Sequence, residues 1–369
     1  MHNMALALHE KGFEITGSDD AIFNPSRQRL KQAGIFPDEL GWFPEKITKN
    51  IDAIILGMHA RIDNPELKKA QKIGLPIYSY PEYIYEQSKD KKRVVIGGSH
   101  GKTSITAMIL HVLQYHEIDF DFMVGAQLEG FTTMVKLTQR SPIIILEGDE
   151  YLSSPIDRKP KFHWYKPHVA VLSGIAWDHI NVFPTFENYV DQFRIFKDDV
   201  IECLIYCEED EHLKSLVNEG VSCRLKGYET YPHRIDDGVT YCKGINEEVT
   251  LAVFGDHNLQ NLNAARLVCE ELDVSEYMFL EAIQSFKGAS KRLELVKKSE
   301  NTAVYKDFAH SPSKLKATST ALKKQFPERK LVACMELHTF SSLNEEFLKQ
   351  YAHCMEEPDI AIVYFSPAA

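Results

Sequence analysis

Side chains that could bind phosphate stand together in one short stretch of the chain. Residues 94–96 are β-branched, residues 97–101 are mostly small, and apolar residues recur at helical spacing from Ile105 to Leu113. A strand, a loop and a helix in this order form a phosphate cradle, in which backbone N–H groups and the helix dipole face an anion. Lys102 adds a full positive charge, and the Thr103 hydroxyl could hold Mg²⁺. We therefore expect this loop to bind a nucleoside triphosphate.

The loop is shorter than the common G-x-x-x-x-G-K-[ST] form, whose first glycine would fall at Ile96. The alternative interpretation is a Gly-Lys-Thr turn on a solvated face, which the apolar flanks of the loop disfavour. The predicted phosphate-binding residues are Gly98, Ser99, His100, Gly101, Lys102, Thr103 and Ser104.

Composition restricts the class of protein. The 369 residues suggest two or three domains, and the net charge of −11 argues against a nucleic-acid partner or an acidic membrane surface. Apolar runs stay short of the roughly 20 residues of a membrane span, and we see no signal peptide. The seven cysteines are scattered without a Cys-x-x-Cys pair, so neither a disulfide framework nor a zinc site is indicated. A reducing cytoplasm fits best.

The first 88 residues have the pattern of a dinucleotide-type domain. Residues 1–11 predict a helix closed by Gly12, and residues 13–16 alternate as a strand that ends at Ser18 and Asp19. In such a fold, an acid in this position often binds a ribose hydroxyl. Because the strand and Gly-rich turn that should come first are absent, we expect the chain to begin one element late. A domain that opens on this helix is the alternative.

A second strand of this domain is predicted at residues 52–57, and the loop after it should face the ligand. His59 and Arg61 in that loop are candidate diphosphate contacts, although exposed loop residues are an equal alternative. Asn64 and Pro65 begin a helix that ends near Gly74. We expect residues 77–93 to be a connection, with a domain boundary near residue 88.

Acidic residues follow two further buried strands, predicted at residues 142–146 and 169–172. Parallel strands bring their carboxyl ends to one edge of a sheet, so these groups should meet the phosphate loop. Each group alone has a plain alternative, a solvated turn for the acids and a structural role for the histidine. Together they predict a metal site at this edge. The acids and histidine are Glu147, Asp149, Glu150, Asp178 and His179.

Residues 193–250 carry no informative motif, with a strand at 204–207, a helix at 210–218 and a strand-rich insertion at 220–249. A helix then opens at Asp256, with Asn258 and Asn261 one turn apart on one face. Paired carboxamides could bind a nucleotide base, and helix capping by Asp256 or Asn258 is the alternative. Residues 288–290 are expected to be a second joint, leading to Lys291 and Arg292.

The last part predicts a strand at 303–305, a helix from Ser311 to Lys324, a strand at 331–335, a helix at 344–355 and a strand at 360–365. Such an alternation is half of a doubly wound sheet. A terminal apolar strand would leave an exposed edge, so we expect about three more elements or a partner that covers it.

Several motifs fall in the order found in the Mur ligases, and the chain resembles that family along nearly its whole length. They are the loop 98–103, Glu147-Gly148-Asp149-Glu150, Asp178-His179, His257-Asn258 with Asn261, Lys291-Arg292 and Asp307-Phe308-Ala309-His310-Ser311-Pro312. The loop and the last segment resemble the muramate-recognising branch. Ser99, Gly148 and Ser311 depart from the usual Thr, Ala and His of the family.

The resemblance implies an α/β protein of three domains. We expect a UDP-binding Rossmann-like domain over 1–88, a central P-loop domain with a mostly parallel sheet over 89–288, and an incomplete Rossmann-like ligase domain over 289–369. It also implies a ligase with ATP and Mg²⁺ as cofactors, which phosphorylates the lactoyl carboxylate of UDP-N-acetylmuramate and transfers the acyl group to an amine.

Residue roles follow from the same resemblance. The catalytic residues would be Lys102, Glu150, His179 and Arg292, and two Mg²⁺ ions would be held by Thr103, Glu150 and His179. ATP would be bound at its adenine by Asn258 and Asn261, at its ribose by Asp307 and at its phosphates by Arg292. The UDP-sugar would be bound by Ser18, Asp19, His59 and Arg61.

The run 157–165 after Glu150 and Tyr151 resembles ligases that attach the recycled tripeptide L-Ala-γ-D-Glu-meso-diaminopimelate. L-Alanine, the acceptor in de novo peptidoglycan synthesis, is the alternative, because that branch has a shorter link here. An unrelated NTPase or kinase and a non-catalytic nucleotide-sugar binding protein are alternatives of other classes. Nothing in the sequence indicates an oligomeric state.

Overall fold

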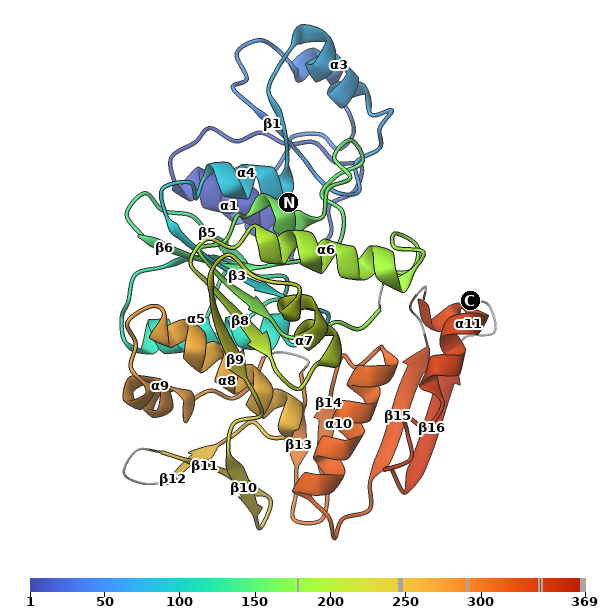
Figure 1. Cartoon of the computed structure of the whole chain (residues 1–369). Coiled ribbons are helices and arrows are strands. Elements are labelled where there is room, and N and C mark those ends of the chain that lie inside the picture. The colour runs from blue at the N-terminus through green and yellow to red at the C-terminus, as the bar shows by residue number, and fades with distance from the viewer. Residues whose placement is uncertain (178, 245–247, 290–291, 338, 340, 366–369) are drawn as a thin grey trace.

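A computed structural model describes residues 1–177, 179–244, 248–289, 292–337, 339 and 341–365. The chain runs from an N-terminal part at the top of Figure 1, through a central sheet, to a C-terminal part at the lower right. The N-terminal part contains α1 (His2–Glu10), α2 (Ser26–Gln32), η1 (Pro44–Lys46), β1 (Ile54–Leu56), α3 (Pro65–Ile73), β2 (Ile77–Ser79) and α4 (Tyr80–Glu86).

Helix boundaries in this part follow the capping signals. The Asn64 side chain accepts hydrogen bonds from the backbone N–H groups of the first turn of α3, and Gly74 ends that helix in the left-handed conformation. The connection predicted over 77–93 is wrong in its first half, which forms β2 and α4. Ser79 and Glu82 make a capping box at the start of α4, a signal that the tyrosine-rich composition obscured.

The strand predicted at residues 13–16 is also wrong. These residues are outside the described strands, because β1 pairs in parallel with β2 and no described strand lies beside 13–16 to complete a ladder. Phe13 is 42% exposed, whereas Ile15 packs against the central core, so the apolar alternation buries one side chain without forming a strand.

A seven-stranded sheet forms the centre of the molecule, in the order β5-β4-β6-β3-β7-β8-β9. Its neighbours pair in parallel except β4 and β5, as the predicted α/β class requires. The strands are β3 (Lys92–Gly97), β4 (Asp121–Met123), β5 (Val135–Lys136), β6 (Ile143–Glu147), β7 (Val169–Leu172), β8 (Cys203–Cys207) and β9 (Arg224–Tyr228). Because β6 and β7 flank β3, the residues that follow all three strands meet at one edge.

Helices cover both faces of this sheet. The helix α5 (Lys102–Tyr115) packs against α8 (Asp256–Glu270) and α9 (Glu276–Ile283), while α6 (Phe186–Asp198) crosses the opposite side (Figure 1). Ile105, Met108 and Val112 of α5 are fully buried, as their spacing predicted. The remaining elements of the central part are η2 (Lys161–Trp164), α7 (Glu211–Asn218), β10 (His233–Asp236), β11 (Val239–Lys243) and β12 (Glu248–Leu251). Over the residues that the structure describes, none of the helices has the length and apolar character needed to cross a membrane.

The C-terminal part contains β13 (Glu294–Lys298), β14 (Ala303–Lys306), α10 (Pro312–Gln325), β15 (Val332–Leu337), η3 (Ser341–Leu343), α11 (Glu345–Leu348), η4 (Lys349–Tyr351) and β16 (Ile360–Phe365). β15 and β16 pair in parallel, as in half of a doubly wound sheet. β14 instead forms an antiparallel hairpin with β13, a sequence neighbour that a tight turn brings to it, and is outside the β15–β16 sheet.

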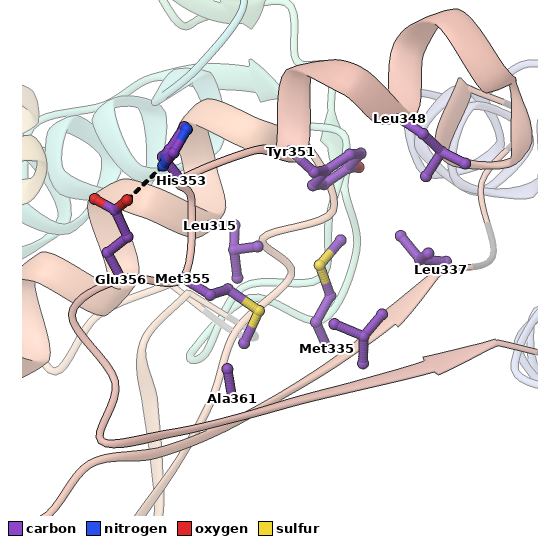
Figure 2. Close-up of a pocket in the computed structure, with 10 residues that line it drawn as sticks. Leu315, Met335, Leu337, Leu348, Tyr351, His353, Met355, Glu356 and Ala361 are labelled. Atoms are coloured by element: carbon purple, nitrogen blue, oxygen red, sulfur yellow. Dashed lines mark hydrogen bonds and ion pairs between the residues drawn. The ribbon is translucent and has the colours of Figure 1, made fainter.

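The helix predicted over 344–355 is shorter than expected. Asn344, where the helix was expected to begin, caps α11, but the helix tightens into η4, and His353 has a φ of 65°, which a right-handed helix excludes. The broken helix leaves an apolar hollow of about 280 Å³ over β15 and β16, lined by Leu315, Met335 and Tyr351 among others (Figure 2). This hollow is separate from the phosphate loop.

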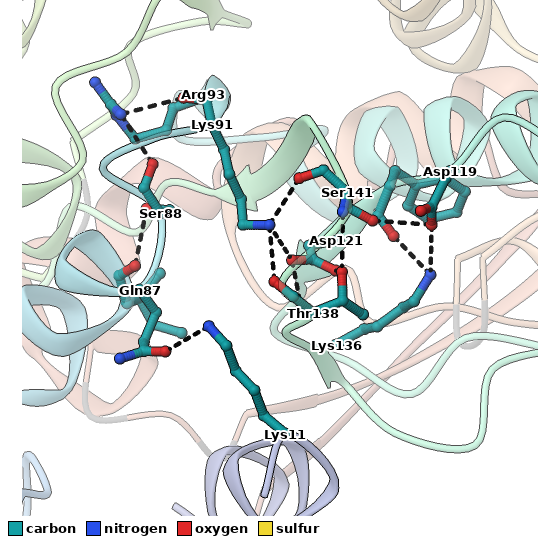
Figure 3. Close-up of polar contacts among 12 residues, drawn as sticks. Lys11, Gln87, Ser88, Lys91, Arg93, Asp119, Asp121, Lys136, Thr138 and Ser141 are labelled. Carbon is teal, nitrogen blue, oxygen red and sulfur yellow. Dashed lines mark hydrogen bonds and ion pairs between the residues drawn. The ribbon is translucent and has the colours of Figure 1, made fainter.

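A buried ion pair connects the amino ends of β3 and β4, on the side of the sheet opposite the phosphate loop (Figure 3). The Lys91 ammonium lies 3.0 Å from the Asp121 carboxylate, with side-chain exposures of 7% and 0%, and donates to the carbonyl oxygens of Thr138 and Ser141. Asp121 in turn accepts from the backbone N–H and the hydroxyl of Thr138. The network joins the starts of β3 and β4 to the turn before β6.

We expect Asp121→Ala to lower the free energy of unfolding by about 3 kcal/mol, because it leaves the Lys91 charge buried without its counter-ion. Denaturant unfolding measures this change. Asp119→Asn is the matched control. Asp119 pairs with Lys136 at 3.4 Å, with exposures of 53% and 40%, and asparagine keeps an oxygen for the Ser141 hydroxyl that Asp119 accepts at 2.8 Å. This change should cost less than about 1 kcal/mol. Equal losses in the two variants would contradict the prediction.

Candidate active site

The backbone of the loop after β3 lies very close to β7 and α8. Gly98 and Gly101 have φ angles of 124° and 72°, which side chains other than glycine rarely adopt. A Cβ at Gly98 would lie 2.2 Å from the Ser173 hydroxyl, and one at Gly101 would lie 2.2 Å from the Asn261 side-chain oxygen. The loop can therefore pass between β7 and α8 only with glycine at both positions, and it enters α5 directly at Lys102.

The Lys102 ammonium points back over the loop. It lies 2.6 Å from Glu150 Oε2 and donates to the Gly98 carbonyl oxygen at 2.7 Å. The side chains of Lys102 and Glu150 are 14% and 2% exposed, so this ion pair is largely shielded from water. The structure thus brings together two residues that are 48 positions apart, as the parallel strands predicted.

Charge balance keeps this lysine protonated. Burial by itself lowers the pKa of Lys102, but the carboxylates of Glu150, Asp149 and Glu147 outweigh burial and raise it. Burial raises the pKa of Glu147, against the opposing effects of the Gly125 N–H group and Lys102. The Lys102 ammonium at the beginning of a helix could bind a polyphosphate, and the three carboxylates beside it could bind a metal ion.

Thr103 contacts a further acid of the site. Its hydroxyl donates to Glu147 Oε1 at 2.9 Å. Glu147 Oε2 also accepts from the Gly125 N–H at 2.9 Å, so this acid links the phosphate loop to the loop after β4. Because the Thr103 hydroxyl donates its hydrogen bond to Glu147, the lone pairs of its oxygen can still bind a cation.

His179 and two acids form a cluster with the spacing of metal ligands. Asp149, Glu150 and His179 each offer a ligand atom, and these atoms lie within 4.8 Å of one another. His179 Nε2 is 3.7 Å from Glu150 Oε1. Burial would raise the pKa of Asp149, but Lys161, whose ammonium is 2.7 Å away, and Lys102 hold it low, at about 2. Asp178, also predicted here, lies outside the described residues.

Two hydroxyl residues of the site join Glu150 to the phosphate loop. The sequence predicts Ser99 only as part of that loop, and it does not indicate Tyr189 of α6, because a tyrosine in an amphipathic helix has no distinguishing pattern. The Tyr189 hydroxyl donates to Glu150 Oε1 at 3.1 Å and lies 2.8 Å from Ser99 Oγ. The two thus connect α6, the phosphate loop and Glu150.

The two asparagines of α8 lie on its buried face. Asn261 packs its side-chain oxygen against Gly101, which places α8 beside the phosphate loop. Asn258 donates from its carboxamide to the Phe254 carbonyl oxygen at 2.9 Å. The capping alternative is not what the structure shows, since Gly255 is the N-cap of α8 without a side-chain cap bond, and Asp256 pairs with Lys324 at 2.6 Å.

Arg292 and Asp307 lie in the C-terminal part near the beginning of α8, where burial lowers the pKa of His257 and the Asp307 carboxylate opposes this effect. The Arg292 guanidinium lies 5.3 Å from the centre of the Phe308 ring. Asp307 accepts from the backbone N–H groups of Leu293 and Phe308 and from the Thr318 hydroxyl. Residue 290 of the predicted joint lies outside the described residues, as does Lys291, which follows it.

The predicted UDP-sugar residues lie in two loops of the N-terminal part. His59 and Arg61 are exposed, and Arg61 forms a surface ion pair with Asp63 at 2.8 Å. Ser18 and Asp19 lie in the segment after α1, where the Asp19 carbonyl oxygen accepts from the Gly41 N–H. Burial, followed by the neighbouring Asp20, raises the pKa of Asp19.

Known proteins match this chain along its length. The family models described as "Mur ligase family, catalytic domain" and "Mur ligase middle domain" match residues 1–92 and 96–269. A UDP-N-acetylmuramate–L-alanine ligase of Sulfurihydrogenibium sp. (strain YO3AOP1) is 31% identical over 379 residues, covering 98% of this chain and 79% of that protein.

Solved structures share the fold. A murein peptide ligase from Psychrobacter arcticus 273-4 has a TM-score of 0.74 at 22% identity, covering 99% of this chain and 82% of that one. A UDP-N-acetylmuramate-alanine ligase from Thermotoga maritima has a TM-score of 0.72 at 21% identity, covering 100% and 84%. With a phosphate loop, a converging acid cluster and these matches, the chain belongs to the Mur ligase family, whose members are ATP-dependent ligases that form C–N bonds.

Proposed function

We propose that this protein uses ATP to activate the lactoyl carboxylate of UDP-N-acetylmuramate and joins it to the amine of L-Ala-γ-D-Glu-meso-diaminopimelate in the cytoplasm. The observation that carries the proposal is the convergence of Lys102, Glu150 and His179 at the beginning of α5. A carboxylate is a poor electrophile, and conversion to an acyl phosphate gives the amine a leaving group to displace. Two anions, the carboxylate and the γ-phosphate, must then approach each other.

The positive charge of Lys102 would reduce the repulsion between the carboxylate and the γ-phosphate. In the structure its charge is balanced by Glu150, 2.6 Å away. A γ-phosphate at the beginning of α5 would compete for the ammonium, because a phosphate carries more charge and also faces the N–H groups of the loop. Preorganised positive charge of this kind is the main contribution a protein makes to phosphoryl transfer.

The acids of the site fit Mg²⁺, which prefers oxygen ligands. Thr103 and Glu150 would hold one ion and His179 the second, with Asp149 close enough to His179 and Glu150 to contribute. Bound Mg²⁺ would neutralise charge that develops on the transferred phosphoryl group. Glu150 would thus alternate between pairing with Lys102 and holding a metal ion.

The other binding roles are proposed on the family resemblance and on placement. Asn261 beside Gly101 supports adenine binding near α8, together with Asn258. Arg292 would reach the phosphates and Asp307 the ribose of ATP. Ser18, Asp19, His59 and Arg61 would bind the UDP-sugar, and the Arg61–Asp63 pair is exposed to water, so it offers little resistance to a phosphate that competes for Arg61.

The tripeptide is supported as acceptor by the run 157–165, which forms a compact link after Glu150. Asp157 accepts from the Ser79 hydroxyl at 2.9 Å and from the Trp164 indole N–H at 2.7 Å, and this ties the link to the N-terminal part. L-Alanine is the second candidate, favoured by the 31% identity to a UDP-N-acetylmuramate–L-alanine ligase. The two acceptors correspond to peptidoglycan recycling and to de novo synthesis.

Release of ADP in the presence of UDP-N-acetylmuramate and Mg²⁺ tests these proposals. We expect turnover with the tripeptide to exceed turnover with L-alanine at equal concentration by at least about tenfold, because polar groups built to bind the longer acceptor are left unpaired when L-alanine binds. Mass spectrometry of the product confirms the amide. If L-alanine supports turnover and the tripeptide does not, the acceptor is L-alanine and the tripeptide assignment is wrong. Binding of UDP-N-acetylmuramate without ADP release would indicate a non-catalytic binding protein, and ADP release independent of it an uncoupled NTPase.

A further inference from the structure

The hydroxyls of Ser99 and Tyr189 form a chain that ends on Glu150. The backbone N–H of Ala176 donates to Ser99 Oγ at 2.9 Å, Ser99 Oγ lies 2.8 Å from the Tyr189 oxygen, and Tyr189 donates to Glu150 Oε1 at 3.1 Å. Ser99, Tyr189 and Glu150 are 5%, 0% and 2% exposed. This chain is therefore shielded from competition with water.

Only one direction of donation is consistent with these contacts. A carboxylate carries no proton, so the Tyr189 proton must point to Glu150. The Tyr189 hydroxyl then has no proton left for Ser99, and Ser99 must donate to it. The Ala176 N–H, a donor only, faces the oxygen of Ser99, which agrees with this order. Hydrogen bonds that run in one direction polarise one another, which strengthens the last bond to the carboxylate.

Glu150 is thus held through its two oxygens by different kinds of group. Lys102 contacts Oε2, and Tyr189 contacts Oε1. Lys102 would leave Glu150 for the phosphate in the proposed reaction, whereas Tyr189 need not move. The Tyr189 ring is held in place by Phe183 and Phe193, whose ring centres lie 5.5 Å and 5.1 Å from it.

We propose that Tyr189, oriented by Ser99, is a positioning residue that fixes the carboxylate of Glu150 for Mg²⁺ when Lys102 turns to the phosphate. This proposal rests on the proposed role of Glu150 as a metal ligand. Ser99 stands where the family usually has threonine, and either residue supplies the hydroxyl that the chain of donors needs. Ser99 and Tyr189 would then influence the metal site through Glu150, although the sequence predicts no contact between Glu150 and either residue.

Tyr189→Phe tests the proposal with little change in volume. We expect the Mg²⁺ concentration that half-saturates ADP binding to rise about tenfold, the factor for losing one hydrogen bond to a charged group. ADP affinity measured by calorimetry without Mg²⁺ should change less than about twofold, because Tyr189 acts through the metal ligand. Ser99→Ala should shift the Mg²⁺ requirement in the same direction, and Ser99→Thr should retain the wild-type value.

Tyr165→Phe is the matched control, because Tyr165 is also fully buried and its hydroxyl makes no hydrogen bond within the described structure. It should leave the Mg²⁺ requirement unchanged. An unchanged requirement in Tyr189→Phe, or an equal shift in Tyr165→Phe, would overturn the proposal.

Glu150→Gln separates this outcome from failure of the proposed function. If Glu150→Gln raises the Mg²⁺ requirement and Tyr189→Phe does not, the chain of hydroxyls has no positioning role and the function stands. If ADP binding to the wild-type protein does not depend on Mg²⁺, the proposed metal role of Glu150 fails, and the inference about Tyr189 fails with it.

Discussion

Lys102→Ala should lower the rate of ADP formation with UDP-N-acetylmuramate and acceptor by about 10³-fold, the range found when one preorganised charge-stabilising donor is removed. The ammonium lies between the carboxylates and the beginning of α5, where the γ-phosphate is expected. No other described lysine contacts Glu150. The loss should appear in kcat as well as in kcat/KM, because the repulsion between carboxylate and phosphate is greatest in the transition state.

The same variant leaves Glu150 buried without its counter-ion, so loss of folding has to be separated from loss of catalysis. Lys102→Met combined with Glu150→Gln removes both charges and should recover most of the thermal stability, while activity stays low. Lys89→Ala is a surface control, because Lys89 pairs with Glu86 outside the site, and it should retain activity. Turnover of Lys102→Ala near the wild-type rate would refute the assignment of the phosphate loop.

Glu150→Gln should lower the same rate by about 10²-fold and raise the Mg²⁺ concentration needed for half-maximal activity. Glutamine keeps the shape of the side chain but loses the charge that attracts a cation. The pKa of Lys102 should fall in this variant, because Glu150 is the largest of the effects that raise it. Activity measured over a series of Mg²⁺ concentrations tests the prediction.

Two further variants make this result specific to Glu150. Glu86→Gln changes an acid that pairs with Lys89 on the surface, and it should leave both the rate and the Mg²⁺ requirement unchanged. Glu147→Gln changes the partner of Thr103, and its effect should differ from that of Glu150→Gln, because Glu147 contacts the loop at Gly125 rather than Lys102. A wild-type Mg²⁺ requirement in Glu150→Gln would remove Glu150 from the metal site.

The elements of the central sheet could be predicted because their signals are local. Three β-branched residues before a glycine loop specify β3, and the apolar spacing after Lys102 specifies α5. The misses lie where a local pattern does not decide the outcome. Residues 13–16 alternate like a strand but have no described strand to pair with, and the last helix already ends at Leu348, before a turn over 349–351 and the left-handed His353.

The sequence by itself determined most elements of the central part and indicated the phosphate loop and the acids that should meet it, because spacing, caps and glycines act over a few residues. Only the tertiary structure decided which partner each group has. The order β6-β3-β7 sets Thr103 against Glu147 and Lys102 against Glu150, a choice between neighbouring acids that sequence spacing cannot make. Likewise, Tyr189 meets Ser99 across 90 residues because α6 packs over the end of the sheet, and no local pattern encodes a contact set by packing at that range.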